Sequence, residues 1–137
     1  LDKKTIAFTR LKLRGTALPK KIESLGSSFA QFKLLRDVDL SSNSIVDFST
    51  CKRIHHSLRM LIDSREFPVF TDFKLTDNKI TSLKSLQAVA SKDADDGEEQ
   101  VSSWPCLTLL NLQKNQIKEL SPISSCPNLR YLDLSDN

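Results

Sequence analysis

The feature of this sequence that most constrains its fold is a pattern of apolar residues that recurs along the chain. The pattern is L-x-x-L-x-L-x-x-N-x-L, where other large apolar residues can replace leucine, and it fits five times. The copies are Phe8, Leu11, Leu13, Thr16, Leu18; Leu35, Val38, Leu40, Asn43, Ile45; Phe70, Phe73, Leu75, Asn78, Ile80; Leu107, Leu110, Leu112, Asn115, Ile117; and Leu129, Leu132, Leu134, Asn137. The repetition predicts a stack of similar units that share one core.

The fourth and sixth positions of each copy indicate a short strand. Alternate side chains of a strand point to the same face, so these two apolar residues face inward together. The asparagine turns the chain, because its amide can satisfy backbone groups that the turn leaves unpaired. The pattern therefore predicts an α/β fold: a right-handed leucine-rich-repeat solenoid with a parallel concave sheet and a helical or 3-10 convex side. An ordinary α/β domain would not place asparagine at the same position in four copies.

The spacing of the asparagines shows where additional residues are inserted. Asn115 and Asn137 are 22 residues apart, as in a compact repeat, whereas the intervals from Asn43 to Asn78 and from Asn78 to Asn115 are 35 and 37. The first insertion, near residues 52–66, has apolar residues at helical spacing and predicts a helix. The second, residues 91–103, is acidic and unpatterned and predicts a mobile loop. We expect residues 1–137 to form a single leucine-rich-repeat domain of about five repeats that lacks its end caps.

Composition excludes several classes of function. The three cysteines, Cys51, Cys106 and Cys126, are irregularly spaced, which argues against a disulfide framework and for a reducing compartment. The sequence has no apolar run long enough to cross a membrane. It also has no phosphate-binding loop, nucleophile elbow or zinc-ligand spacing. We therefore expect no catalysis, cofactor, metal, membrane or small-molecule substrate.

Charge is distributed unevenly along the chain. The net charge is +3, but residues 1–36 carry a net +7 and residues 91–103 a net −4. A basic end of this kind favours a polyanion such as RNA as a partner.

Strand residues that point away from the core are expected to line the concave face. This face is basic at the first strand, acidic across the second and third, and apolar at Leu109 and Tyr131. An exposed leucine beside an aromatic residue is typical of an interface anchor, and aspartates would pair with Lys or Arg of the partner. The layout fits a basic amphipathic helix lying across the sheet. The predicted protein-binding residues are Asp37, Asp39, Asp72, Lys74, Leu109, Asn111, Tyr131 and Asp133.

The first repeat and its return resemble a known family. The residues that carry the resemblance are Leu11-Lys12-Leu13-Arg14-Gly15, Pro19, Ile22-Glu23-Ser24-Leu25-Gly26, Phe29, Gln31-Phe32, and Val38-Asp39-Leu40-Ser41-Ser42-Asn43-Ser44-Ile45. They resemble the U2 A-prime family of spliceosomal leucine-rich-repeat proteins.

The resemblance implies a non-catalytic, nuclear snRNP subunit that acts in mRNA splicing. Its concave face would bind an RRM protein of the B-double-prime type, and the pair would hold a U2 snRNA stem-loop. The residues that would face the RNA backbone are Arg10, Lys12, Arg14, Lys20 and Lys21.

Two other functions of the same fold stay open. One is a regulatory subunit that docks on a phosphatase, although those solenoids have many uniform repeats and this chain has few, irregular ones. The other is a cytoskeletal or axonemal adaptor of similar repeat length. Dependence of binding on RNA separates the first interpretation from these two.

Overall fold

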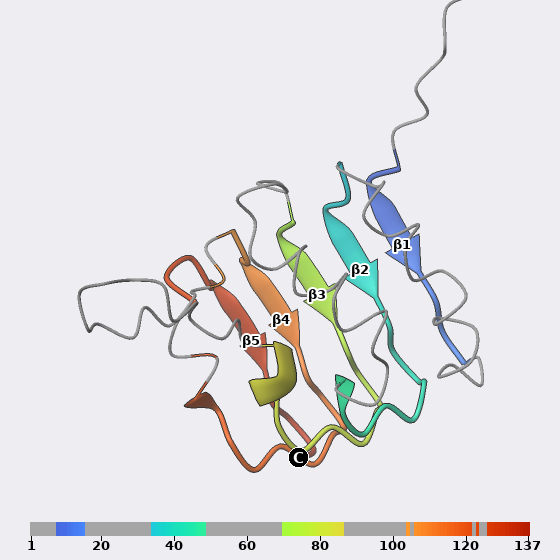
Figure 1. The fold of residues 1–137 in the computed structure, drawn as a ribbon, viewed down its shortest axis with the longest axis vertical. Helices are drawn as coiled ribbons and strands as arrows, with labels where there is room; N and C mark the ends of the chain where they lie inside the picture. Colours follow the sequence, from blue (N-terminus) through green and yellow to red (C-terminus); the bar gives the residue numbers. More distant parts are fainter. Residues whose placement is uncertain are drawn as a thin grey trace, which may run out of the picture.

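The five strands expected from the repeat form one parallel sheet. The structure is a computed structural model that describes residues 8–15, 34–48, 70–86, 104, 106–121, 123 and 126–137. Its strands are β1 (Arg10–Lys12), β2 (Asp37–Asp39), β3 (Asp72–Lys74), β4 (Leu109–Asn111) and β5 (Tyr131–Asp133), and they lie side by side in chain order (Figure 1). The predicted helix near 52–66, the predicted loop at 91–103, Lys20 and Lys21 lie outside the described residues.

Equivalent positions of successive repeats stand next to each other across the sheet. The first strand position forms the row Arg10, Asp37, Asp72, Leu109 and Tyr131, which we call the first row. The third strand position forms the second row, Lys12, Asp39, Lys74, Asn111 and Asp133. The chemistry of the concave face is therefore set row by row.

The core lies behind the sheet, where the fourth and sixth positions of the repeat meet. The residues with no exposed surface at these positions are Val38, Leu40, Phe73, Leu75, Leu110 and Leu112. The Phe73 ring lies 5.6 Å from that of Phe70 and 6.4 Å from that of Phe48, measured between centroids. On the return path, the described residues include one 3-10 helix, η3 (Lys84–Leu86), as expected for the convex side.

Three core positions differ from the expectation. Phe8 and Leu132 occupy inward positions of the first and last copies but are 54% and 38% exposed, because β1 and β5 are each paired with a strand on one side alone. Trp104, which the sequence placed at the border of the acidic insertion, is instead fully buried in the core.

The asparagines close each turn with their side-chain amides. Nδ2 of Asn78 donates to the carbonyl oxygen of Leu75 in its own repeat (2.9 Å) and to that of Leu40 in the preceding one (3.1 Å). Asn43, Asn115 and Asn137 repeat this pair of bonds. The predicted role of the asparagine is confirmed in all four copies, and each one ties two repeats together.

The asparagine is the ninth position of the pattern, and the residue before this position has left-handed backbone geometry in every copy. The φ angles are 60° at Gly15, 59° at Ser42, 57° at Asp77, 54° at Lys114 and 58° at Asp136. This conformation costs an L-residue roughly 1–2 kcal/mol, and glycine avoids the cost. Backbone strain is therefore present in the four copies without glycine, and the hydrogen bonds of the asparagines offset its cost.

Candidate functional site

The concave face is built from the outward residues of the two rows and from Arg14, which follows β1. The two rows contain three cations (Arg10, Lys12, Lys74) and four anions (Asp37, Asp39, Asp72, Asp133), and with Arg14 the face carries no net charge. Which of these charges stay free for a partner depends on which side chains pair within the sheet.

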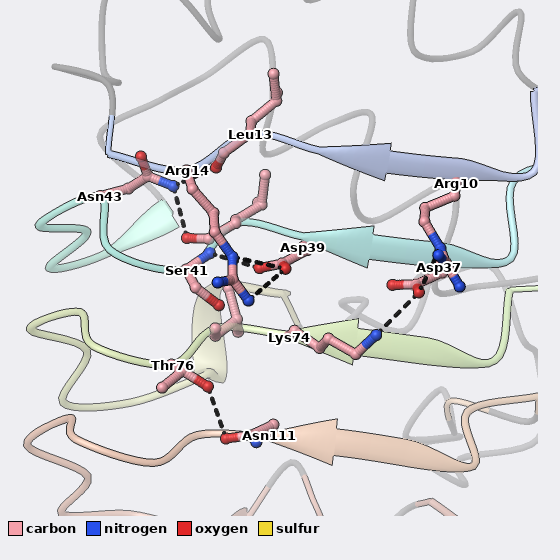
Figure 2. Close-up of polar contacts among 12 residues, drawn as sticks. Arg10, Leu13, Arg14, Asp37, Asp39, Ser41, Asn43, Lys74, Thr76 and Asn111 are labelled. Atoms are coloured by element: carbon pink, nitrogen blue, oxygen red, sulfur yellow. Dashed lines mark hydrogen bonds and ion pairs between the residues drawn. The ribbon is translucent and has the colours of Figure 1, made fainter.

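Asp37 on β2 is paired from both sides. Its Oδ2 atom lies 3.0 Å from Arg10 Nε on β1 and accepts a 2.9 Å hydrogen bond from Lys74 Nζ on β3 (Figure 2). Its side chain is only 10% exposed. A buried carboxylate is tolerated when cations and hydrogen bonds compensate for its lost hydration.

Asp39, the next outward residue of β2, is also paired, in this case with one cation. Arg14 reaches over β2 to contact Asp39 Oδ2 through Nε and Nη2, each at 2.8 Å (Figure 2). The Ser41 backbone donates to Asp39 Oδ1 at 3.1 Å. Burial opposes ionisation of Asp39, but the hydrogen bonds of Arg14 and Ser41 together outweigh it and lower its pKa from the ordinary 3.8.

These pairs correct the expected charge gradient. Asp37 and Asp39 were predicted to meet basic residues of a partner, but both are buried and already bound to cations of this chain. Arg10 stands directly opposite Asp37 in the parallel register. Lys74 and Arg14 reach Asp37 and Asp39 diagonally, each from two residues further along the neighbouring repeat. The second strand is therefore not an acidic surface, and the face does not favour a strongly basic helix.

An apolar area remains on β4 and β5. Leu109 is half-buried in the first row, and its neighbour Tyr131 is 49% exposed. Asp133 follows in the second row, and hydrogen bonds from Ser135 and Tyr131 lower its pKa, so it is ionised at neutral pH. The predicted anchors thus lie together on the sheet, with a charged residue at their border.

The other predicted protein-binding residues differ in whether their side chains already have a partner within the sheet. Asn111 Oδ1 accepts from Thr76 Oγ1 at 2.9 Å and from Gln113 N at 3.0 Å, so it already braces the sheet (Figure 2). Lys74 is already in an ion pair with Asp37. Asp72 is half-buried, and its side chain makes no hydrogen bond or ion pair with another described residue.

Of the residues predicted to face RNA, Arg10, Lys12 and Arg14 lie together on or just after β1. The side chains of Arg10 and Arg14 are 74% and 51% exposed despite their ion pairs. Lys12 is exposed and forms no ion pair within the described part of the chain.

A depression opens on the concave side where β1, β2 and β3 begin. Its volume is about 380 Å³, and it is lined by Thr9, Arg10, Arg36, Asp37, Thr71 and Asp72. Sequence reasoning did not select Arg36, because it lies one residue before the outward positions of the strand. Its position directly before Asp37, at the end of the basic segment 1–36, could have indicated that it lies beside the concave face.

A match to a family model supports the fold. Residues 107–137 match the family model described as "Leucine Rich repeats (2 copies)". No curated protein matches the chain by sequence. The solved structure of internalin C2 from Listeria monocytogenes is similar over 91% of this chain and 60% of its own, with 20% identity and a TM-score of 0.37. The strands, the register and the matched repeats together identify the fold as a leucine-rich-repeat solenoid.

The fold indicates what this surface does. Leucine-rich repeats are typically non-catalytic scaffolds whose concave sheet binds other proteins. Within the described ranges, no helix is long and apolar enough to cross a membrane, and no cluster of side chains could hold a metal ion. The parallel sheet and the matched repeats make the chain suited to protein–protein interaction.

Proposed function

We propose that this chain is a non-catalytic subunit of a nuclear ribonucleoprotein, and that its concave face binds an RRM protein of the B-double-prime type. The pair would hold a stem-loop of the U2 snRNA. The first repeats support this proposal through their resemblance to the U2 A-prime family. The observation that carries the protein contact is the exposed Tyr131 beside the half-buried Leu109 on the sheet.

The partner segment is an amphipathic helix with an apolar stripe. Leu109 and Tyr131 offer the stripe a flat area that loses water on binding, which is how anchor residues dominate interface energy. Because the charged residues of the face balance, the polar side of the helix carries both signs of charge and is not uniformly basic.

RNA contact is proposed at the basic end of the solenoid, at Lys12 and Arg14 together with Lys20 and Lys21. Lys12 supports the proposal best, since no described carboxylate neutralises it. Such contacts bind phosphates without reading bases, and their contribution falls as salt rises.

The protein contact is tested by titrating the RRM protein into the purified chain without RNA. Tyr131→Ala and Leu109→Ala should each weaken binding by about tenfold or more, the effect expected of an interface anchor. Lys118→Ala changes an exposed residue beyond the turn of the fourth repeat and should leave the affinity unchanged. Equal binding by all three variants would refute the concave binding mode.

A second titration, with the U2 stem-loop present, tests the RNA contact. Lys12→Gln should weaken the RNA-containing complex and reduce its salt dependence, but leave binding of the RRM protein alone intact. If RNA does not change the affinity of any variant, a phosphatase-docking or adaptor role is favoured instead.

A further inference from the structure

The depression at the start of β1–β3 is lined by two arginines, of which Arg10 is held in an ion pair and Arg36 is not. Arg10 is held through Nε by Asp37 Oδ2 at 3.0 Å, yet its side chain is 74% exposed. Its two terminal nitrogens can therefore meet a ligand without an orientation cost, because the ion pair has already fixed the guanidinium. Arg36 is exposed, and its side chain forms no bond with another described residue.

The lining residues carry two positive and two negative charges, and Lys74, which is bound to Asp37 beside them, makes one positive charge in excess. Asp37 is already shared by Arg10 and Lys74, and Asp72 on β3 is the remaining acid. Arg36 directly precedes β2, and its side chain forms no ion pair with a described residue. The hydroxyl groups of Thr9 and Thr71 belong to the lining and add neutral hydrogen-bond donors.

We propose that this depression is a carboxylate-binding site, and that its occupant is an Asp or Glu side chain of the protein that docks on the concave face. Arginine suits this ligand because its planar guanidinium donates two parallel hydrogen bonds to a carboxylate. The inference rests on the proposed function only in taking the partner to be a protein.

A single carboxylate fits the site better than a run of phosphates. A nucleic-acid backbone brings several negative charges, and Asp72 would repel those that lie beyond Arg36. The site is also continuous with the apolar anchors, because the first row runs from Arg10 to Leu109 and Tyr131. A protein segment can reach both.

The register fixes where the acidic residue lies on the partner. The depression is centred on β2, two and a half strand spacings from the middle of β4 and β5, or about 12 Å at roughly 4.8 Å per strand. A helix crossing the strands rises about 1.5 Å per residue, so the acidic side chain lies about eight residues from the apolar anchor. This spacing distinguishes the expected partner from a helix that carries only an apolar stripe.

The test uses Arg36→Gln, with Arg130→Gln as its matched control. Arg130 is exposed at the equivalent position before β5, away from the depression. Neither side chain forms an ion pair or hydrogen bond with a described residue, so both variants should fold like the unchanged chain, which their melting temperatures check. In a titration with the RRM protein without RNA, Arg36→Gln should lower the affinity about tenfold and Arg130→Gln should not. Equal affinities of the two variants would overturn the proposal.

A small probe tests the site without the RRM protein. Titration with N-acetyl-glutamate methylamide should shift the side-chain Nε–H NMR signals of Arg10 and Arg36 and leave that of Arg130 in place. If these signals move but the RRM protein does not bind, the proposed function fails and the carboxylate site stands. If the RRM protein binds through Leu109 and Tyr131 while neither assay responds to Arg36, the carboxylate site fails alone. An effect of Arg36→Gln that appears only with RNA assigns the site to phosphate and contradicts the proposal.

Discussion

Asn78 illustrates how much of this fold depends on single polar residues. Its Nδ2 donates to the carbonyls of Leu40 and Leu75 and, at 3.4 Å, to that of Thr76. Its Oδ1 accepts from the backbone nitrogens of Asn43 (3.1 Å) and Ile45 (3.0 Å). The residue is buried, so no water replaces these bonds when the side chain is removed. One side chain therefore satisfies backbone groups of two repeats.

We expect Asn78→Ala to reduce the free energy of unfolding by roughly 3 kcal/mol, because it leaves several buried backbone groups unpaired. Urea denaturation followed by circular dichroism measures the loss. Gln116→Ala removes an exposed amide from the next turn and should change the stability by less than about 0.5 kcal/mol. Similar losses in the two variants would show that the asparagine amides are not structural.

Asp39 makes the stability depend on pH in a defined direction. Its pKa is lower in the folded chain than the ordinary 3.8, so its stabilising contribution is fully present above that value. The contribution is lost as the pH falls from 3.8 through the folded pKa. Arg14→Gln should raise the pKa of Asp39 and flatten the acid side of the stability curve. NMR titration of the Asp39 carboxyl carbon checks this, and an unchanged pKa in Arg14→Gln would contradict it.

Among the strands, β3 lies at the centre of both the sheet and the core. It pairs in register with β2 and β4, and its inward residue Phe73 packs between Phe48 and Phe70. Its outward residue Lys74 fixes Asp37 on the neighbouring strand. This element therefore connects the packing behind the sheet with the charge pattern in front of it.

Phe73→Ala should lower the free energy of unfolding by about 4 kcal/mol, the cost of a large cavity in a closed core. Val46→Ala deletes methyl groups from a side chain that is 54% exposed and should cost less than about 0.5 kcal/mol. Thermal and urea unfolding of both variants measure the difference. A small effect of Phe73→Ala would mean that the repeats do not share one core.

The elements could be predicted from the sequence because each follows from a local pattern. The alternation of Val38 and Leu40 with polar residues places the strand, and Asn43 places the turn. The pairing of Arg14 with Asp39 could not be predicted, since it depends on how far a long side chain reaches across its neighbour. Burial of Trp104 was missed for a similar reason: its slot in the core exists only after the repeats have stacked.

At the scale of the whole molecule, the expected acidic part of the concave face is replaced by paired charges. On the β1–β3 side the charges other than Lys12 are paired or lie around the depression, and the β4–β5 side offers Leu109 and Tyr131. The candidate residues were found from the sequence because outward strand positions are countable. The register and the ion pairs were needed to show which of these residues are free to bind a partner.

Site-specific crosslinking tests the concave binding mode most directly. A photoreactive benzoyl-phenylalanine replaces Tyr131 on β5 in one variant and Lys118 beyond the turn in another, and each is irradiated with the RRM protein. Binding through the concave face predicts a crosslink from position 131 and none from position 118. A crosslink from position 118 with none from position 131 would contradict it.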